Sequence, residues 1–147
     1  MLTQKQILDA VDAELIKLFP GITVYRNLVP TEFVRPSAMT RLTGQTMAVR
    51  TLSTVQRTAT VLVTLFCPVD DHHSTDADTL GAQADTVMEH FSAPGLPAAG
   101  RVLDIGTVAC NPQADFAEVT IPLSWDDDRA VERPAYEMME TLHLEME

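Results

Sequence analysis

The longest segment rich in β-branched residues, residues 46–69, constrains the fold more than any other part of the sequence. It reads TMAVRTLSTVQRTATVLVTLFCPV, and its many Thr and Val side chains suit a pleated surface. We expect a strand near 47–52 and a second strand near 57–67, with a turn or bulge between them. Alternate residues of the second strand are apolar, which predicts that one of its faces points into the core. These residues are Ala59, Val61, Val63, Leu65 and Cys67.

Two amphipathic helices are expected, one on each side of this segment. Residues 4–19 carry apolar side chains at helical spacing after a T-x-x-Q capping box, and a Pro-Gly pair ends the helix. The second helix begins after Ser74 or Thr75, either of which can cap it, and its apolar stripe extends to Phe91.

Shorter strands complete the pattern. They are expected at 22–29, 37–42, 101–110 and 116–125. Gly44 breaks the chain after the second of them, and Pro122 places the last at a sheet edge or at a change of partner. Residues 92–100 are expected to form a Pro- and Gly-rich loop, and residues 126–134 a charged loop.

This order of elements predicts an α+β fold, with a mostly antiparallel sheet of about five strands and two helices packed on one face. The 147 residues fit a single domain spanning 1–147, which can bury its own core. In the C-terminal extension, residues 130–147, apolar residues alternate. A terminal strand is favoured there, with a helix as the alternative, and the extension can pack on a neighbouring subunit. The alternating residues are Met138, Leu142, Leu144 and Met146.

The charge of the chain is strongly acidic but unevenly distributed. The net charge is −11, which argues against nucleic-acid binding through the overall field. Residues 26–57 nevertheless sum to +4, whereas residues 58–100 sum to −6 and residues 101–147 to −8. The basic segment is either a solvated sheet face or one half of an interface in which it meets an acidic face of another copy.

Residue patterns that would carry chemistry are weak. The segment DDHHSTDAD, residues 70–78, contains metal-ligand types but is typical of a polar loop before a capped helix. WDDDR, residues 125–129, is typical of a solvated turn. Cys67 and Cys110 are far apart, and we expect buried free thiols. The sequence therefore predicts no catalytic, cofactor or metal site, no membrane span and no enzyme, with a small metal-dependent enzyme as an alternative.

The segment TEFVRPSAMTRL, residues 31–42, is interpreted as structural. Pro36 sets the start of a strand because it cannot donate to a ladder. Phe33 and Val34 then anchor either the incoming link or a neighbour, while Arg35 and Arg41 supply positive charge that the acidic remainder of the protein lacks.

Several segments together resemble a known family. LFPGITVY at the end of the first helix, FVRPSAMTRL, the strand ending in VLVTLFCP, the second helix and FAEVTIPLSW follow in this order. With these segments, over about residues 3–125, the chain resembles the tail terminator (tail completion) proteins of long-tailed bacteriophages and prophages.

The resemblance implies a structural virion protein without a cofactor. Family members form homo-oligomeric rings, commonly hexamers, that cap the tail tube, end its polymerisation and offer a surface for head–tail joining. The implied partners are other copies of the chain, the tail tube protein and a head-completion or neck protein, while DNA only passes through the channel. The implied location is the head-proximal end of the virion tail, and the host cytoplasm during assembly. Another phage connector, such as a neck or minor tail protein, is the alternative.

A ring also needs two different faces of one subunit to meet on neighbouring copies. We therefore hypothesise that a basic set of residues contacts an acidic set on another subunit or on the tail tube, and contacts within one subunit are the open alternative. The residues concerned are Phe33, Arg35, Arg41, Arg50 and Arg57 on one side, and Asp126, Asp127 and Asp128 on the other.

Overall fold

The computed structural model describes residues 2–29, 31, 33–67 and 77–128 of the chain. Its helices and strands are α1 (Gln4–Leu18), β1 (Thr23–Arg26), β2 (Ser37–Val49), β3 (Thr54–Phe66), α2 (Ala77–His90), β4 (Gly95–Ala98), β5 (Arg101–Ile105), β6 (Ala109–Pro112) and β7 (Phe116–Asp128). The predicted caps of the second helix and the C-terminal extension lie outside the described residues. No helix in the described part is long and apolar enough to cross a membrane.

One sheet contains all seven strands. Its order is β1-β2-β3-β7-β5-β4, and β6 pairs with β7 beside this path. Every pairing is antiparallel except that of β1 with β2. The predicted α+β class and mostly antiparallel sheet are therefore confirmed, with seven strands in place of about five.

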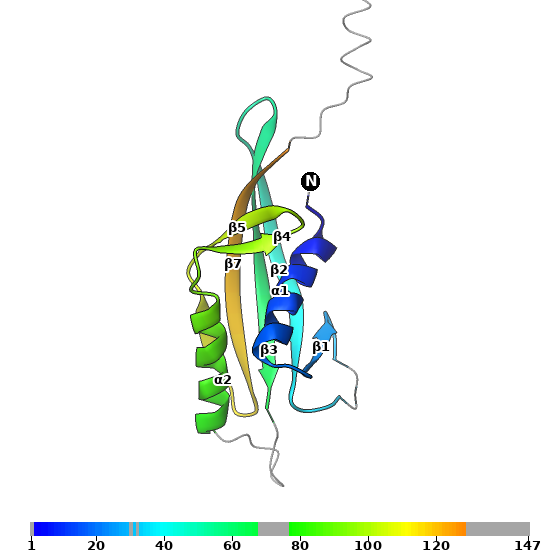
Figure 1. Ribbon diagram of the computed structural model, residues 1–147, viewed down its shortest axis with the longest axis vertical. Coiled ribbons are helices and arrows are strands. Elements are labelled where there is room, and N and C mark those ends of the chain that lie inside the picture. Colours follow the sequence, from blue (N-terminus) through cyan, green and yellow to red (C-terminus); the bar gives the residue numbers. More distant parts are fainter. Residues whose placement is uncertain (1, 30, 32, 68–76, 129–147) are drawn as a thin grey trace, which may run out of the picture.

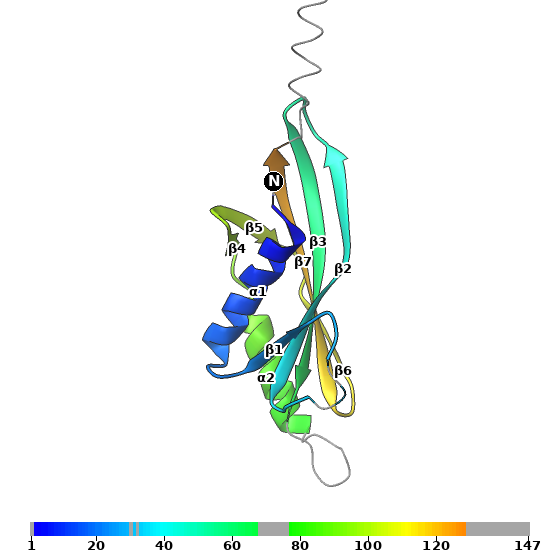
Figure 2. The same ribbon diagram turned by 90° about the vertical axis from the view of Figure 1, so that its right-hand side faces the viewer.

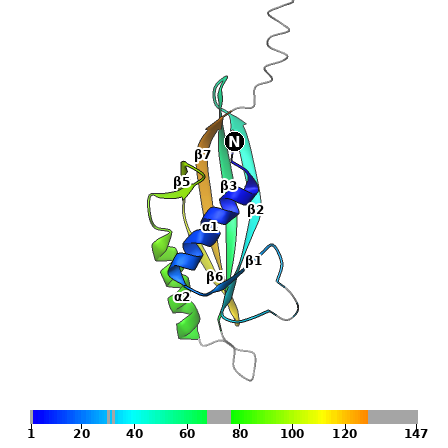
Figure 3. The same cartoon turned by 45° about the vertical axis from the view of Figure 1, so that its right-hand side comes forward.

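Both helices pack on the same face of the long central strands β2, β3 and β7 (Figures 1 and 2). α1 crosses this face obliquely, while α2 runs along the lower part of β7 (Figure 3). α1 begins at the predicted capping box, formed by Thr3 and Gln6, and ends before Gly21, whose φ of 83° suits glycine. Burying each large aliphatic residue of its inner face stabilises the fold by about 1.5–3 kcal/mol. These residues are Ile7, Leu8, Val11 and Leu15.

β2 corrects one prediction. Residues 37–42 and 47–52 were expected as separate strands, but Ser37–Val49 is continuous and pairs with β3 along its length. The register shifts between Leu42 and Gly44, which is a bulge. Gly44 therefore bends the strand without ending it, because the ladder resumes directly after the extra residue.

β7 changes partner at its proline, as predicted. β6 pairs with it as far as Thr120, and β5 pairs with it from Leu123. Between them the N–H of Gly106 donates to the carbonyl oxygen of Pro122 at 2.8 Å. The expected single strand at 101–110 is consequently two strands.

Two further differences concern segments predicted as loops. β4 lies inside 92–100, where its position at the edge of the sheet tolerates Pro97. β7 continues to Asp128, because residues 126–128 pair with residues 54–56 of β3. The three aspartates therefore belong to a strand.

The β2–β3 hairpin projects beyond the helices at one end of the molecule (Figures 1 and 2). We call residues 41–57 the arm. The N-terminal end of α1 and the end of β7 lie beside it (Figure 1). β7 therefore supports the β3 side of the arm as far as Thr54, and the loop beyond it extends away from the helices (Figure 1).

Candidate assembly surface

The outer edge of β2 is largely unpaired. β1 covers it only from Ser37 to Thr40, and from residue 41 to residue 49 no other described strand pairs with it. All residues from Thr43 to Val49 are exposed. An open edge presents unpaired N–H and C=O groups that can template pairing with another chain.

Apolar side chains gather at the far end of this arm. Met47 is 53% exposed, Val49 is 65% exposed and Leu52, in the connecting loop, is 88% exposed. Met47 and Val49 lie opposite Arg57 and Val55 of β3, two buried residues on the face that carries the helices. Exposed apolar residues grouped on an open sheet edge indicate an interaction site.

A buried ion pair braces the arm directly opposite Met47. Arg57 Nη1 lies 3.3 Å from Asp127 Oδ2, and the side chains are 7% and 0% exposed. Arg57 also donates to the carbonyl oxygen of Leu2 and to Gln45 Oε1, and its guanidinium lies 5.0 Å from the centroid of the Trp125 ring. These contacts join the N-terminus, β2, β3 and β7 within one subunit.

Asp127 is the acceptor at the centre of this network. It accepts hydrogen bonds from the backbone N–H of Leu2 (2.9 Å), the indole of Trp125 (3.1 Å) and the backbone N–H of Asp128 (2.8 Å). Arg101 adds a guanidinium at 3.1 Å. Burial opposes ionisation of the carboxyl, but the three N–H donors and the nearby charge outweigh it. The pKa of Asp127 therefore lies well below its ordinary value.

The other charges near the end of β7 also pair within the subunit. Arg50 Nη1 lies 3.2 Å from Asp126 Oδ2, and both side chains are about half exposed, at 53% and 54%. Arg101 Nη2 lies 3.0 Å from Asp128 Oδ2. The structure thus brings Arg50 and Arg57 to Asp126 and Asp127, but as neighbours on one sheet.

Phe33 and Arg35 form a separate joint at the lower end of the sheet. Arg35 donates to the carbonyl oxygens of Cys67 (2.8 Å) and Asp115 (3.0 Å). Its guanidinium lies 4.9 Å from the Phe33 ring centroid and 5.3 Å from that of Phe66. The link before β2 is thereby fastened to the ends of β3 and β7.

Arg41 differs from the other singled-out arginines. It is exposed at the start of the open edge and makes no ion pair with another described residue. It lines a shallow groove on the face opposite the helices, together with Leu62, Phe66, Phe116 and Glu118. Arg41 is the basic residue that the fold leaves available for a partner.

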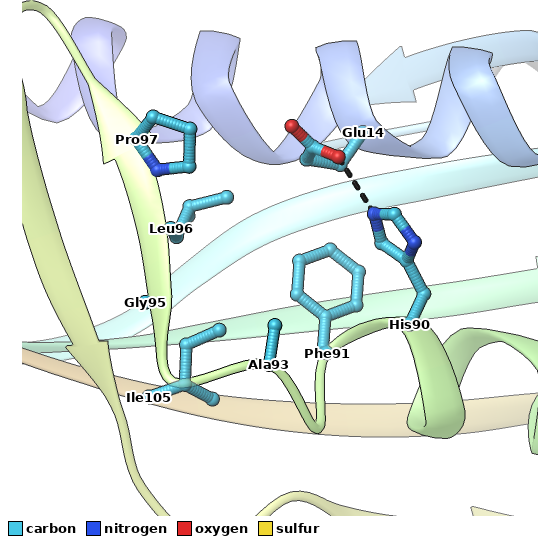
Figure 4. Close-up of a pocket in the computed structure, with 8 residues that line it drawn as sticks. All are labelled: Glu14, His90, Phe91, Ala93, Gly95, Leu96, Pro97 and Ile105. Atoms are coloured by element: carbon cyan, nitrogen blue, oxygen red, sulfur yellow. Dashed lines mark hydrogen bonds and ion pairs between the residues drawn. The ribbon is translucent and has the colours of Figure 1, made fainter.

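A small pocket between α1, the end of α2 and β4 contains one polar pair (Figure 4). Glu14 Oε2 lies 2.6 Å from His90 Nε2, and Phe91 and Leu96 supply apolar wall. Burial opposes ionisation of Glu14, but its bonds to His90 and Lys17 hold its pKa below the ordinary value. The pair ties the two helices together and is a structural contact.

The other residues that the sequence singled out form no metal site within the described part of the chain. The predicted metal-ligand segment 70–78 lies outside the described residues except for its last two positions, and no cluster of metal-ligating side chains occurs within the described part. Both cysteines are free thiols in the structure. Cys67 is buried, as predicted, whereas Cys110 is only half-buried, and burial raises the pKa of each thiol.

Sequence reasoning did not single out the open edge or its apolar residues. The signal was present: Met47, Val49 and Leu52 lie in the segment from Arg41 to Arg57, with no neighbouring apolar element expected to cover them. Leu2, Trp125 and Arg101, which complete the buried network, were missed as well.

Comparisons with known proteins add little to this picture. No protein-family model and no curated protein matches the sequence. A solved structure, of a protein whose name states no activity, aligns with 90% of this chain and 99% of its own at 15% identity, with a TM-score of 0.44. A likeness at this level supports no inference about function.

Proposed function

We propose that this protein is a tail-terminator-like assembly protein, which forms a ring on the end of a phage tail tube. In this role it ends tail polymerisation and offers the surface for head–tail joining, with the tail tube protein and a head-completion protein as its partners. DNA passes through the ring without specific binding. No reaction and no cofactor is assigned to it.

The open edge of β2 is the observation that carries this proposal. Monomeric proteins protect such edges with charges, prolines or bulges. Here Arg41 and the bulge at Gly44 protect the lower part, but residues 45–49 have no charge and no proline. An uncovered edge with exposed apolar side chains is expected to be buried when the protein assembles.

The placement of charges agrees with a role in assembly. The buried ionisable groups, Arg57 and Asp127, brace the arm from within the subunit. A brace of this kind presents the edge in one orientation, and a ring closes only when each subunit repeats the same rotation. An edge that is already rigid also loses less conformational entropy when two subunits associate.

Electron microscopy tests the proposal directly. Purified protein is added to tail tubes assembled from the tube protein of the same phage or prophage genome, and the tube ends are imaged in negative stain. We expect a ring on one end of each tube and no further growth when more tube protein is added. Rings seen only on the portal end of heads would instead identify a neck connector, and bare, growing tubes would overturn the proposal.

A further inference from the structure

The open edge of β2 and the C-terminal segment of the chain match in length and pattern. In the edge from Arg41 to Arg50, Thr43 is the extra residue of the bulge and does not count towards the pairing. The edge therefore spans eight pairing steps. Residues 137–145 also span eight steps. We propose that residues 137–145 of a neighbouring copy add to β2 as a parallel strand; this rests on the proposed ring.

The match extends to individual side chains. Pairing Arg41 with Glu137 places Arg50 opposite Glu145, so that both ends of the added strand are joined by opposite charges on the face away from the helices. On the helix side, polar residues meet polar residues and apolar residues meet apolar ones. These pairs are Leu42 with Met138, Gln45 with Glu140, Met47 with Leu142, and Val49 with Leu144.

The reverse direction fits less well. In the antiparallel register that keeps the two charge pairs, Met47 would face Glu140 and Gln45 would face Leu142. Charge favours the same segment over other occupants, because residues 134–147 carry four acids and no Lys or Arg. Arg41 is free of ion pairs with other described residues, and Arg50 remains 53% exposed beside Asp126, which leaves room for a second carboxylate.

Geometry assigns the added strand to a neighbour. β7 ends at Asp128, which pairs with Thr54 near the tip of the arm, whereas Glu137 must reach the level of Arg41. That is about 26 Å down the sheet at ~3.3 Å per residue and about 14 Å across three strand spacings. The nine chain steps from 128 to 137 reach at most about 32 Å when fully extended, which leaves almost no slack for a detour over a face of the sheet. The straight path of about 30 Å runs through the sheet, so the chain's own tail cannot follow it.

A mixed cross-linking experiment on the full chain tests the assignment. One preparation carries Val49→Cys and the other Leu144→Cys, both with Cys110→Ser and with the buried Cys67 kept. Directly paired strand positions are close enough for a disulfide. After mixing and mild oxidation under conditions in which the wild type forms rings, we expect a disulfide-linked heterodimer as the main product on a non-reducing gel. Val102→Cys, which replaces an equally exposed valine on β5, is the control partner and should give at least tenfold less.

Each other outcome counts against a distinct part of the account. Wild-type rings without a heterodimer above the control would overturn the strand addition and leave the ring intact. A cross-link that forms only within a single chain carrying both cysteines would overturn the neighbour assignment. A charge exchange gives an independent check. Arg41→Glu should raise the protein concentration needed for ring formation at least tenfold, and Glu137→Arg in the same chain should restore the wild-type value. If the wild type forms no ring alone or on tail tubes, the proposed function itself fails.

Discussion

Arg57 and Asp127 are buried opposite charges on the neighbouring strands β3 and β7, with Nη1 and Oδ2 3.3 Å apart. Arg57 lies in the arm directly opposite Met47, and Leu2 bonds to both charged residues. The pair therefore couples the N-terminus to the arm. In this account a polar contact inside one subunit sets the direction of the edge that another subunit uses.

Breaking this pair from one side should strongly destabilise the fold. Asp127→Ala leaves the Arg57 guanidinium buried without its counter-charge, and we expect a loss of about 3–5 kcal/mol in the free energy of unfolding. Urea denaturation followed by circular dichroism measures the change. Asp126→Ala, which removes an exposed pair with Arg50, is the matched control and should cost at most about 1 kcal/mol. Equal losses in the two variants would contradict the buried network.

The same carboxylate should make stability depend on pH in acid. The folded-state pKa of Asp127 is depressed from an ordinary value of 3.8. The stabilisation that ionised Asp127 gives the folded protein is therefore fully present above about pH 4 to 5. It is lost as the pH falls below the ordinary pKa towards the lower folded-state pKa. Asp127→Asn should be less stable than the wild type at pH 7 and should lose less on acidification.

Thermal unfolding midpoints between pH 7 and pH 2 measure this difference. If the wild type and Asp127→Asn respond identically to acid, Asp127 is not the group responsible.

The contact between the two helices predicts a smaller effect. His90→Ala removes the bond to Glu14, whose side chain is only 12% exposed, and should cost about 1–2 kcal/mol in the free energy of unfolding. Lys17→Ala removes the other partner of Glu14 but is 68% exposed, so its cost should be under about 0.5 kcal/mol. Denaturant titration of both variants compares them, and a reversed order would contradict the structural role of His90.

Much of the fold follows from sequence periodicity. The apolar alternation in β3 and the helical spacing in α1 each predicted the buried face correctly, because burial decides both patterns. Pro122 also predicted its change of partner, since a residue without an N–H cannot complete a regular ladder. The bulge at Gly44 was mistaken for a break, because glycine occurs at both and only the pairing with β3 distinguishes them.

The buried charges illustrate what alternation can and cannot reveal. Arg57 lies on the same face of its strand as Ala59 and Val61, and Asp127 lies on the same face as Leu123 and Trp125, because alternate residues share a face. Both positions therefore point to the core side. Their charge made exposure the simpler expectation, because an unpaired buried charge is very costly. Only the three-dimensional structure shows that the two strands bring the opposite charges together.

We propose that copies of this protein assemble through the open edge of β2. Val49→Lys and Val102→Lys provide a matched pair, since the two valines are 65% and 68% exposed but only Val49 lies on that edge. The decisive measurement is the molar mass of wild type and both variants by light scattering, with and without tail tubes. We expect rings from the wild type and from Val102→Lys, and a folded monomer from Val49→Lys. Rings of the same mass from Val49→Lys would contradict the proposal.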